Sequence, residues 1–262
     1  MNLLFIGDVV GSPGRRAVKE LLPKIKQEHS VDVVIANCEN AAGGSGITIA
    51  TARELFDSGV EVMTMGDHLW DQKDIYHLLE RENRMLRPIN YPHGTPGRGM
   101  LILEKPGYPS VAVLNVQGRT FMADLENPFR AIQEGVNAAR QKTSVIFVDV
   151  HAEATSEKIA MGRMLDGKVS AVIGTHTHVQ TADEQIFPGG TAFLCDAGFT
   201  GPHESVIGRD YHAVVQRFLT NMPQRFEVAS ERIMLQGAVV SVDEQTGKAR
   251  SIKRVSELLV NS

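Results

Sequence analysis

The strongest constraint on the fold is an alternation of two kinds of segment along the chain. Short runs of β-branched and apolar residues alternate with longer amphipathic stretches. This alternation favours an α/β fold built largely on parallel strands, because each helix returns the chain to the same end of the sheet. The predicted strands are residues 2–7, 32–37, 61–65, 111–116, 144–149, 169–173 and 191–195.

Helical spacing is clearest between the first two predicted strands. Ala17, Leu21 and Ile25 repeat every four residues, which places them on one face of a helix. Ser12 is expected to cap this helix, and Pro13 suits its first turn. Further helices are predicted at residues 49–57, 71–80, 128–140, 156–165 and 211–219.

The period of the pattern changes toward the end of the chain. From Arg225 to about Val255 apolar and polar residues alternate with a period of two, which predicts antiparallel strands that close a sheet. Residues 87–99 are rich in proline and glycine and are predicted to form a loop. The length of 262 residues is enough for one sizeable core, so we expect a single domain that spans residues 1–262.

The composition argues against several classes of protein. A formal net charge of -4 disfavours a broad basic surface for nucleic acid, whereas a small phosphorylated ligand is compatible with it. Two cysteines do not make a disulfide framework, and we expect a cytoplasmic protein. The apolar start stops at Asp8 without the features of a secretion signal, so we expect none. We also expect no membrane span, which requires an apolar run of about 20 residues.

Residues of metal-binding type follow the predicted strands at the points where those strands end. They are Asp8 after the first strand, Glu39 and Asn40 after the second, Asp67 and His68 after the third, His151 after the fifth, and His176 and His178 after the sixth. In an open α/β sheet the carboxyl ends of parallel strands share one edge, and ligands bind there. We therefore expect these side chains to converge at the edge of one sheet.

Convergent carboxylates and imidazoles suit divalent ions such as Mn²⁺, Fe²⁺, Zn²⁺ or Ni²⁺. Because one catalytic zinc ion usually takes about three protein ligands, a larger set predicts two metals. A pair about 3.5–4 Å apart can bind a phosphoryl oxygen and an attacking hydroxide. The predicted ligands are Asp8, Glu39, Asp67, His151, His176 and His178.

Each of these residues also has a simpler explanation. Asp8 and Asp67 follow glycine, as in ordinary turns, and a lone histidine such as His151 is more often a hydrogen-bonded core residue. The closely spaced pair His176 and His178 is harder to explain by packing. Taken together, the set favours a metal centre.

The motifs around these residues carry a family resemblance. They are Gly-Asp-Val-Val-Gly at 7–11, Glu-Asn-Ala-Ala-Gly at 39–43, Met-Gly-Asp-His at 65–68, and the segments 117–121, 151–158, 174–183 and 196–202. They resemble the YmdB-like branch of the calcineurin-type metallophosphoesterases, over nearly the whole chain. The resemblance implies a four-layered αββα sandwich and phosphodiesterase activity toward 2′,3′-cyclic nucleotides.

The resemblance also implies a role for each site residue. One metal would be bound by Asp8, Glu39 and His178, and the other by Glu39, Asp67, His151 and His176, so that Glu39 bridges both. Asn40 would lie beside the first metal and the phosphate. A hydroxide bridging the metals would attack phosphorus, while His68 as general acid protonates the departing alkoxide. Mn or Fe are the expected metals, with Zn, Mg and Ni as alternatives.

Two positions depart from the wider pattern. Val10 stands where the superfamily usually has a histidine ligand, a feature that the YmdB-like branch shares. Asp67 stands where the family usually has asparagine. Both side chains ligate through oxygen, so we expect the metal to bind at a site that carries one more negative charge.

The expected partner is a small phosphorylated substrate, either a cyclic nucleotide or an RNA end. Arg119 is a candidate phosphate contact, although a surface ion pair explains it equally well. A homo-oligomer is expected, since most soluble oligomers are symmetric assemblies of one chain.

Two other functions are weighed against this one. An amidohydrolase-like enzyme also uses two histidines separated by one residue, but that pair ends the first strand of a β/α barrel, whereas here the pair begins at His176. The second alternative is a regulatory protein that holds metals and a ligand with little turnover, and the unusual Asp67 keeps it open.

Overall fold

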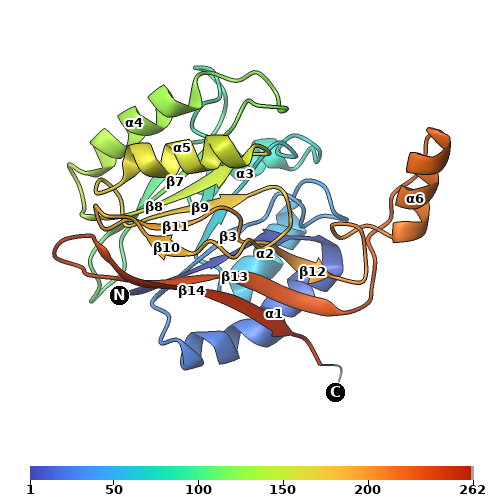
Figure 1. Cartoon of the computed structure of the whole chain (residues 1–262), viewed down its shortest axis with the longest axis horizontal. Helices are drawn as coiled ribbons and strands as arrows, with labels where there is room; N and C mark the ends of the chain where they lie inside the picture. Colours follow the sequence, from blue (N-terminus) through green and yellow to red (C-terminus); the bar gives the residue numbers. More distant parts are fainter. Residues whose placement is uncertain (261–262) are drawn as a thin grey trace.

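Two β-sheets lie at the centre of the structure, a computed structural model that describes residues 1–260 (Figure 1). The first sheet contains β1 (Asn2–Ile6), β2 (Asp8–Val9), β3 (Val33–Asn37), β4 (Val62–Thr64), β5 (Met85–Leu86), β12 (Phe199–Pro202), β13 (Ile233–Val242) and β14 (Ala249–Leu258). Its order is β2-β12-β13-β1-β3-β4-β5, and β14 pairs with β13. From β1 to β5 the neighbours are parallel, whereas β13 is antiparallel to β1 and to β14.

The second sheet contains β6 (Met100–Leu103), β7 (Val111–Gln117), β8 (Val145–His151), β9 (Ala171–Thr175), β10 (Gln185–Ile186) and β11 (Ala192–Leu194). Its order is β10-β11-β9-β8-β7-β6. The four inner strands are parallel, and both edge strands are antiparallel to their neighbours. This sheet therefore also directs the carboxyl ends of its inner strands to one edge.

Alternating side chains of β1 pack on opposite faces of the first sheet, as expected for a strand with two buried faces. Leu4 and Ile6 join a cluster with the helices on the outer face, whereas Leu3 and Phe5 join a cluster between the sheets. The rings of Phe5 and Phe147 lie 4.9 Å apart, which brings β1 and β8 together face to face.

The helices are α1 (Gly11–Glu28), α2 (Ile49–Asp57), α3 (Ile75–Arg81), α4 (Pro128–Ala139), α5 (Thr155–Leu165) and α6 (Tyr211–Thr220). Residues of α1, α2 and α3 pack on the outer face of the first sheet, and residues of α4 and α5 pack on the outer face of the second. Figure 1 shows α1 on one side of the sheets and α4 with α5 on the other. Among residues 1–260, no helix is both long enough and apolar enough to span a membrane.

Some local predictions were wrong. The residue before α1 is Val10, and no side chain caps the helix there, so Ser12 is not its cap. Helix α3 begins at Ile75 instead of residue 71, because the Asp71 carboxylate is already bound by His68 and Ser45. The tail forms the two antiparallel strands expected, but they begin only at Ile233.

Candidate metal centre

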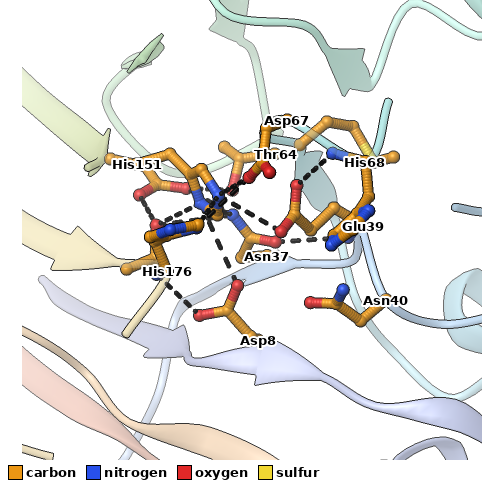
Figure 2. A network of polar contacts seen from close by, with 12 residues as sticks. Asp8, Asn37, Glu39, Asn40, Thr64, Asp67, His68, His151 and His176 are labelled. Atoms are coloured by element: carbon orange, nitrogen blue, oxygen red, sulfur yellow. Dashed lines mark hydrogen bonds and ion pairs between the residues drawn. The ribbon is translucent and has the colours of Figure 1, made fainter. Parts of the chain in front are cut away.

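The acidic ligand candidates come from the first sheet, and the histidines come from the second. Asp8 lies in β2, Glu39 follows β3 and Asp67 follows β4. His151 is the last residue of β8, and the other two histidines follow β9. The prediction that these residues lie at the edge of a single sheet is therefore wrong. They converge because the two sheets pack face to face. Figure 2 shows the side chains of Asp8, Glu39, Asp67, His151 and His176 pointing toward one another.

Four candidates form a tight cluster. The Nε2 atom of His151 lies 3.2 Å from Glu39 Oε1 and 2.9 Å from Asp67 Oδ1. The Nδ1 atom of His176 lies 3.2 Å from the same Asp67 oxygen and 3.1 Å from His151 Nε2. One ligand atom from each of the four residues lies within 4.8 Å of the others, close enough for a single cation to contact all of them.

The electrostatics of this cluster favour positive charge at its centre. Burial by itself lowers the pKa of His151, but the charge of Glu39 and the hydrogen bond to Asp67 outweigh it and raise that pKa well above its ordinary value. A bound divalent cation would supply the same positive charge and leave the imidazole free to act as a neutral ligand.

Asp8 and His178 form a second pair of candidates beside the cluster. Asp8 is fully buried, and its Oδ1 atom has no hydrogen-bond partner among residues 1–260. The Nε2 atom of His178 lies 3.8 Å from that oxygen, while the Nδ1–H group of His178 donates to the carbonyl of Ile207 at 3.0 Å. Because buried polar atoms nearly always have a partner, the orphaned oxygen opposite an imidazole nitrogen fits a metal ligand.

The loop that carries His176 and His178 is strained and firmly held. Both residues have left-handed backbone, with φ values of 96° and 60°, which is costly for residues other than glycine. Thr177 between them donates its N–H and its hydroxyl to Asp196 Oδ2, at 3.1 and 2.7 Å. The same oxygen accepts a hydrogen bond from Lys158 Nζ at 2.7 Å, and both partners of this ion pair are buried. The buried pair therefore anchors the strained loop.

A buried chain of hydrogen bonds orients His151. The hydroxyl of Thr175 donates to Asp149 Oδ1 at 2.7 Å, so its oxygen is left to accept from His151 Nδ1, 3.0 Å away. Asn37 and Thr64 also donate to Asp149. With its Nδ1–H group engaged in this way, His151 presents Nε2 to the cluster.

His68 and Asn40 lie at the border of the centre, as Figure 2 shows. The His68 imidazole Nδ1 is 2.8 Å from Asp71 Oδ2 and 3.2 Å from the Ser45 hydroxyl. Its backbone N–H donates to Glu39 Oε2 at 3.1 Å. Asn40 is buried and donates to the carbonyl of Gly44, while its Oδ1 atom has no partner in the part of the chain described.

A cavity of about 310 Å³ gives access to these residues. Its lining includes Glu39, Asn40, His68, Glu153, His176 and His178. The volume is large enough for a phosphate group and an attached sugar. The cavity lies at the carboxyl ends of the strands, where ligands bind in α/β proteins.

Two residues of this cavity were missed in the sequence. Glu153 Oε2 lies 3.2 Å from His176 Nε2, and its position two residues after His151 was the signal that could have identified it. Arg209 also lines the cavity and donates to the carbonyls of Gly43 and Gly44. It lies far from the strand ends, so the sequence pattern gave no sign of it. Arg119 instead contacts Asp124 at 3.4 Å on the exposed surface.

Comparisons with known proteins agree along the whole chain. A family model described as YmdB-like protein matches residues 4–255. A Bacillus subtilis (strain 168) protein named 2′,3′-cyclic-nucleotide 2′-phosphodiesterase is 48% identical over 255 residues, which cover 97% of this chain and 96% of that protein. The crystal structure of a hypothetical protein from Thermus thermophilus matches with a TM-score of 0.92 and 43% identity, over 98% of this chain and 99% of that one. The crystal structure of a Mycoplasma pneumoniae phosphatase matches with a TM-score of 0.93 and 32% identity, over 98% and 93% of the two chains.

Proposed function

The chain belongs to the YmdB-like family, and on that premise we propose that it is a metal-dependent phosphodiesterase that hydrolyses 2′,3′-cyclic nucleotides. The observation that carries the proposal is the cluster of Glu39, Asp67, His151 and His176, of which Glu39 and His176 line the cavity. A chain with this cluster and with close relatives named for phosphodiesterase and phosphatase activity is an enzyme, so the alternative of a regulatory protein with little turnover is not favoured.

Two divalent metals fit the residues present. Asp8, Glu39 and His178 would hold one, and Glu39, Asp67, His151 and His176 would hold the other. The orphaned oxygen of Asp8 and the raised pKa of His151 support this assignment. When bound, such a metal pair supplies a nucleophile at neutral pH and neutralises charge on the phosphoryl oxygens. Mn or Fe are the proposed ions, because carboxylates and imidazoles suit them.

The protein's own residues then position the substrate and move the proton. His68 borders the cavity and is held by Asp71, so it can protonate the ribose oxygen that leaves phosphorus. Asn40 has a free carbonyl oxygen and a buried side chain, which suits it to orient groups at the first metal. Glu153 accepts from His176 Nε2 and thereby keeps Nδ1 of that ring turned toward the cluster.

Further properties are proposed on the same basis. The proposed fold is a four-layered αββα sandwich, and the hydrophobic clusters on both faces of each sheet support it. Cys38 and Cys195 are free and buried, which is in keeping with the proposed cytoplasmic location. We also propose that the chain forms a single domain and that the protein is a homo-oligomer.

Hydrolysis of 2′,3′-cyclic AMP by the Mn²⁺-loaded protein tests the function. Cleavage of the bond to the 2′ oxygen, the position in the name of the Bacillus subtilis relative, yields 3′-AMP, and chromatography separates it from 2′-AMP. Glu39→Gln should abolish turnover, since it weakens both proposed metal sites. A fully loaded protein that binds the cyclic nucleotide without converting it would overturn the proposal in favour of the regulatory alternative.

A further inference from the structure

Arg209 is a cation in the cavity that the proposed function leaves without a role. In the described part of the chain it is the one arginine or lysine that lines the cavity. Two carboxylates, Glu39 and Glu153, share that lining. Because carboxylates repel an anionic phosphodiester, a positive side chain here bears directly on substrate binding.

The half-buried guanidinium of Arg209 is held by neutral acceptors. Its Nη1 atom donates to the carbonyls of Gly43 and Phe226, at 3.1 and 3.4 Å, and Nη2 donates to the carbonyl of Gly44. Burial lowers the pKa of Arg209, and no neighbouring charge offsets this effect. Since arginine nevertheless stays charged in proteins, the cavity holds a positive charge whose counterion is not found in residues 1–260.

Part of the hydrogen-bonding capacity of this guanidinium is left over. The three carbonyls account for both N–H groups of Nη1 and for one of Nη2. The Nε–H group and the second N–H of Nη2 have no acceptor within the described residues. Nε and Nη2 share one edge of the guanidinium, and N–H groups on one edge match two oxygens of a phosphate.

The position of Arg209 is fixed by its surroundings. Its backbone N–H donates to the carbonyl of Val206 at 2.9 Å, and Arg209 forms a β-bridge with Val228. The side chain packs against Gly44, where a Cβ atom would lie only 2.5 Å from Nη1. The Gly44 carbonyl also accepts from Asn40 Nδ2 at 3.3 Å, so the guanidinium lies beside Asn40.

We propose that Arg209 is a substrate-binding residue whose guanidinium contacts an anionic oxygen of the phosphodiester. This inference rests on the proposed function, which places the phosphate beside Asn40. Residues 42–46, which we call the glycine loop, supply two of the carbonyls that hold the guanidinium. Its donors are therefore oriented before the substrate arrives, and little side-chain freedom is lost on binding.

Loss of this contact should weaken binding more than it slows chemistry. A hydrogen bond between charged groups corresponds to about a 10–100-fold change in affinity. Arg209→Met should raise the dissociation constant of the Mn²⁺-loaded protein for inorganic phosphate by that factor, as isothermal titration calorimetry would measure. The KM for 2′,3′-cyclic AMP should rise similarly, with kcat changed by less than about 5-fold.

Two conservative variants separate the charge of Arg209 from its hydrogen bonds to the glycine loop. Arg209→Lys keeps the charge, whereas Arg209→Gln keeps an amide that can donate to the same carbonyls. Phosphate affinity should fall from wild type to the Lys variant and further to the Gln variant. The surface control is Arg250→Met, which removes a partner of Asp243 and should leave the affinity unchanged. A Gln variant that binds phosphate as tightly as wild type would mean that Arg209 only holds the loop, and would overturn the proposal.

The glycine loop provides a second test that leaves Arg209 in place. Gly43 and Gly44 both have left-handed backbone, with φ values of 64° and 89°, so alanine strains either position. The new Cβ meets no atom within 4 Å at Gly43, but at Gly44 it would displace the guanidinium. Gly44→Ala should therefore weaken phosphate binding at least about 5-fold more than Gly43→Ala. Equal weakening by the two variants would contradict the proposal.

Metal content and thermal unfolding check that each variant keeps its metal centre and its fold. Weaker phosphate binding that merely follows loss of metal would overturn the role of Arg209. The two proposals can also fail separately. A wild-type protein that binds phosphate through Arg209 but leaves 2′,3′-cyclic AMP intact would contradict the proposed function alone. Hydrolysis by wild type, with phosphate affinity and KM unchanged in Arg209→Met, would contradict this inference alone.

Discussion

His68 is placed to donate a proton and is not among the clustered ligand atoms. His68→Ala should leave metal content near that of wild type but slow 2′,3′-cyclic AMP hydrolysis by about 10²–10⁴-fold, the usual contribution of a general acid. Hydrolysis of a p-nitrophenyl diester should be affected much less, because its leaving group needs little protonation. Steady-state rates on both substrates check the prediction, and equal slowing would assign His68 another role.

The protonation of His68 depends on its acidic neighbours. Burial lowers its pKa, but the charge of Glu39 and the hydrogen bond to Asp71 outweigh burial and raise the pKa above its ordinary value. The acid is present below that pKa and is lost as pH rises through it. Asp71→Asn should therefore move the alkaline limb of the kcat profile to lower pH. The control is Asp74→Asn, which should leave the profile unchanged. A profile that Asp71→Asn does not shift would contradict this account.

Asp67 adds a negative charge that an asparagine at this position would not carry. Burial raises its pKa, but hydrogen bonds with His151 and His176 outweigh burial and hold the pKa well below its ordinary range, so the carboxylate is ionised. Asp67→Asn should weaken metal retention, tighten inhibition by inorganic phosphate about 10-fold and raise diester turnover. Two unit charges 4 Å apart at an effective dielectric of 20 interact by ~4 kcal/mol. Solvent and metal coordination reduce this interaction energy, so we expect about a 10-fold change in phosphate inhibition. Phosphate inhibition measured at saturating Mn²⁺ checks it, and equal inhibition of both proteins would leave only a geometric role.

At the scale of elements, the buried pair of Lys158 and Asp196 fixes the loop of Thr177. Lys158→Met removes the cation and leaves a buried carboxylate unpaired, which should lower the free energy of unfolding by about 3–5 kcal/mol. Denaturant unfolding measures the change. The pair of Arg84 and Glu82 is the control, because it lies at the surface with Arg84 exposed and Glu82 half-buried, and Arg84→Met should cost at most about 1 kcal/mol. Similar losses from both variants would mean that burial of the pair does not matter.

The longer elements could be predicted because their periodicity is strong. Helix α2 has the predicted bounds, and α1 contains the predicted face of Ala17, Leu21 and Ile25. The two-residue strands β2, β5 and β10 are too short to show any period. Helix α3 starts late because Asp71 binds side chains instead of continuing the helix, a tertiary effect that local pattern does not contain.

At the scale of the molecule, the candidate site was easier to predict than the arrangement that creates it. The six expected ligands were named because each lies at or just after the end of a predicted strand, and their role as ligands stays a prediction. That their strands belong to two sheets could not be read from the ends of the strands, since it depends on the packing of Phe5 against Phe147 and their neighbours. Glu153 follows the end of β8 by two residues and was overlooked, whereas Arg209 enters the cavity from a segment outside the strand-end pattern.

Because the ligands come from both sheets, metal binding and folding should be coupled. A ligand present at 100 times its dissociation constant stabilises the folded state by about 2.7 kcal/mol, and for a chain of this size each kcal/mol shifts Tm by roughly 2–4 °C. Removing metal with EDTA should therefore lower Tm by about 5–10 °C, as differential scanning calorimetry would measure. The Glu39→Gln protein is the control, and its Tm should respond little. A wild-type Tm that is insensitive to EDTA would mean that no metal bridges the sheets.

The thiol of Cys38 can report on opening of the ligand-bearing end of the first sheet, because Cys38 lies next to Glu39 at the end of β3. Its thiol is fully buried beside Glu39, and burial raises its pKa, so the reactive thiolate does not form in the closed state. Alkylation of Cys38 requires the strand ends of the first sheet to part from their surroundings. The alkylation rate therefore measures how often the ligand-bearing end of the first sheet opens away from the helices that pack on its outer face.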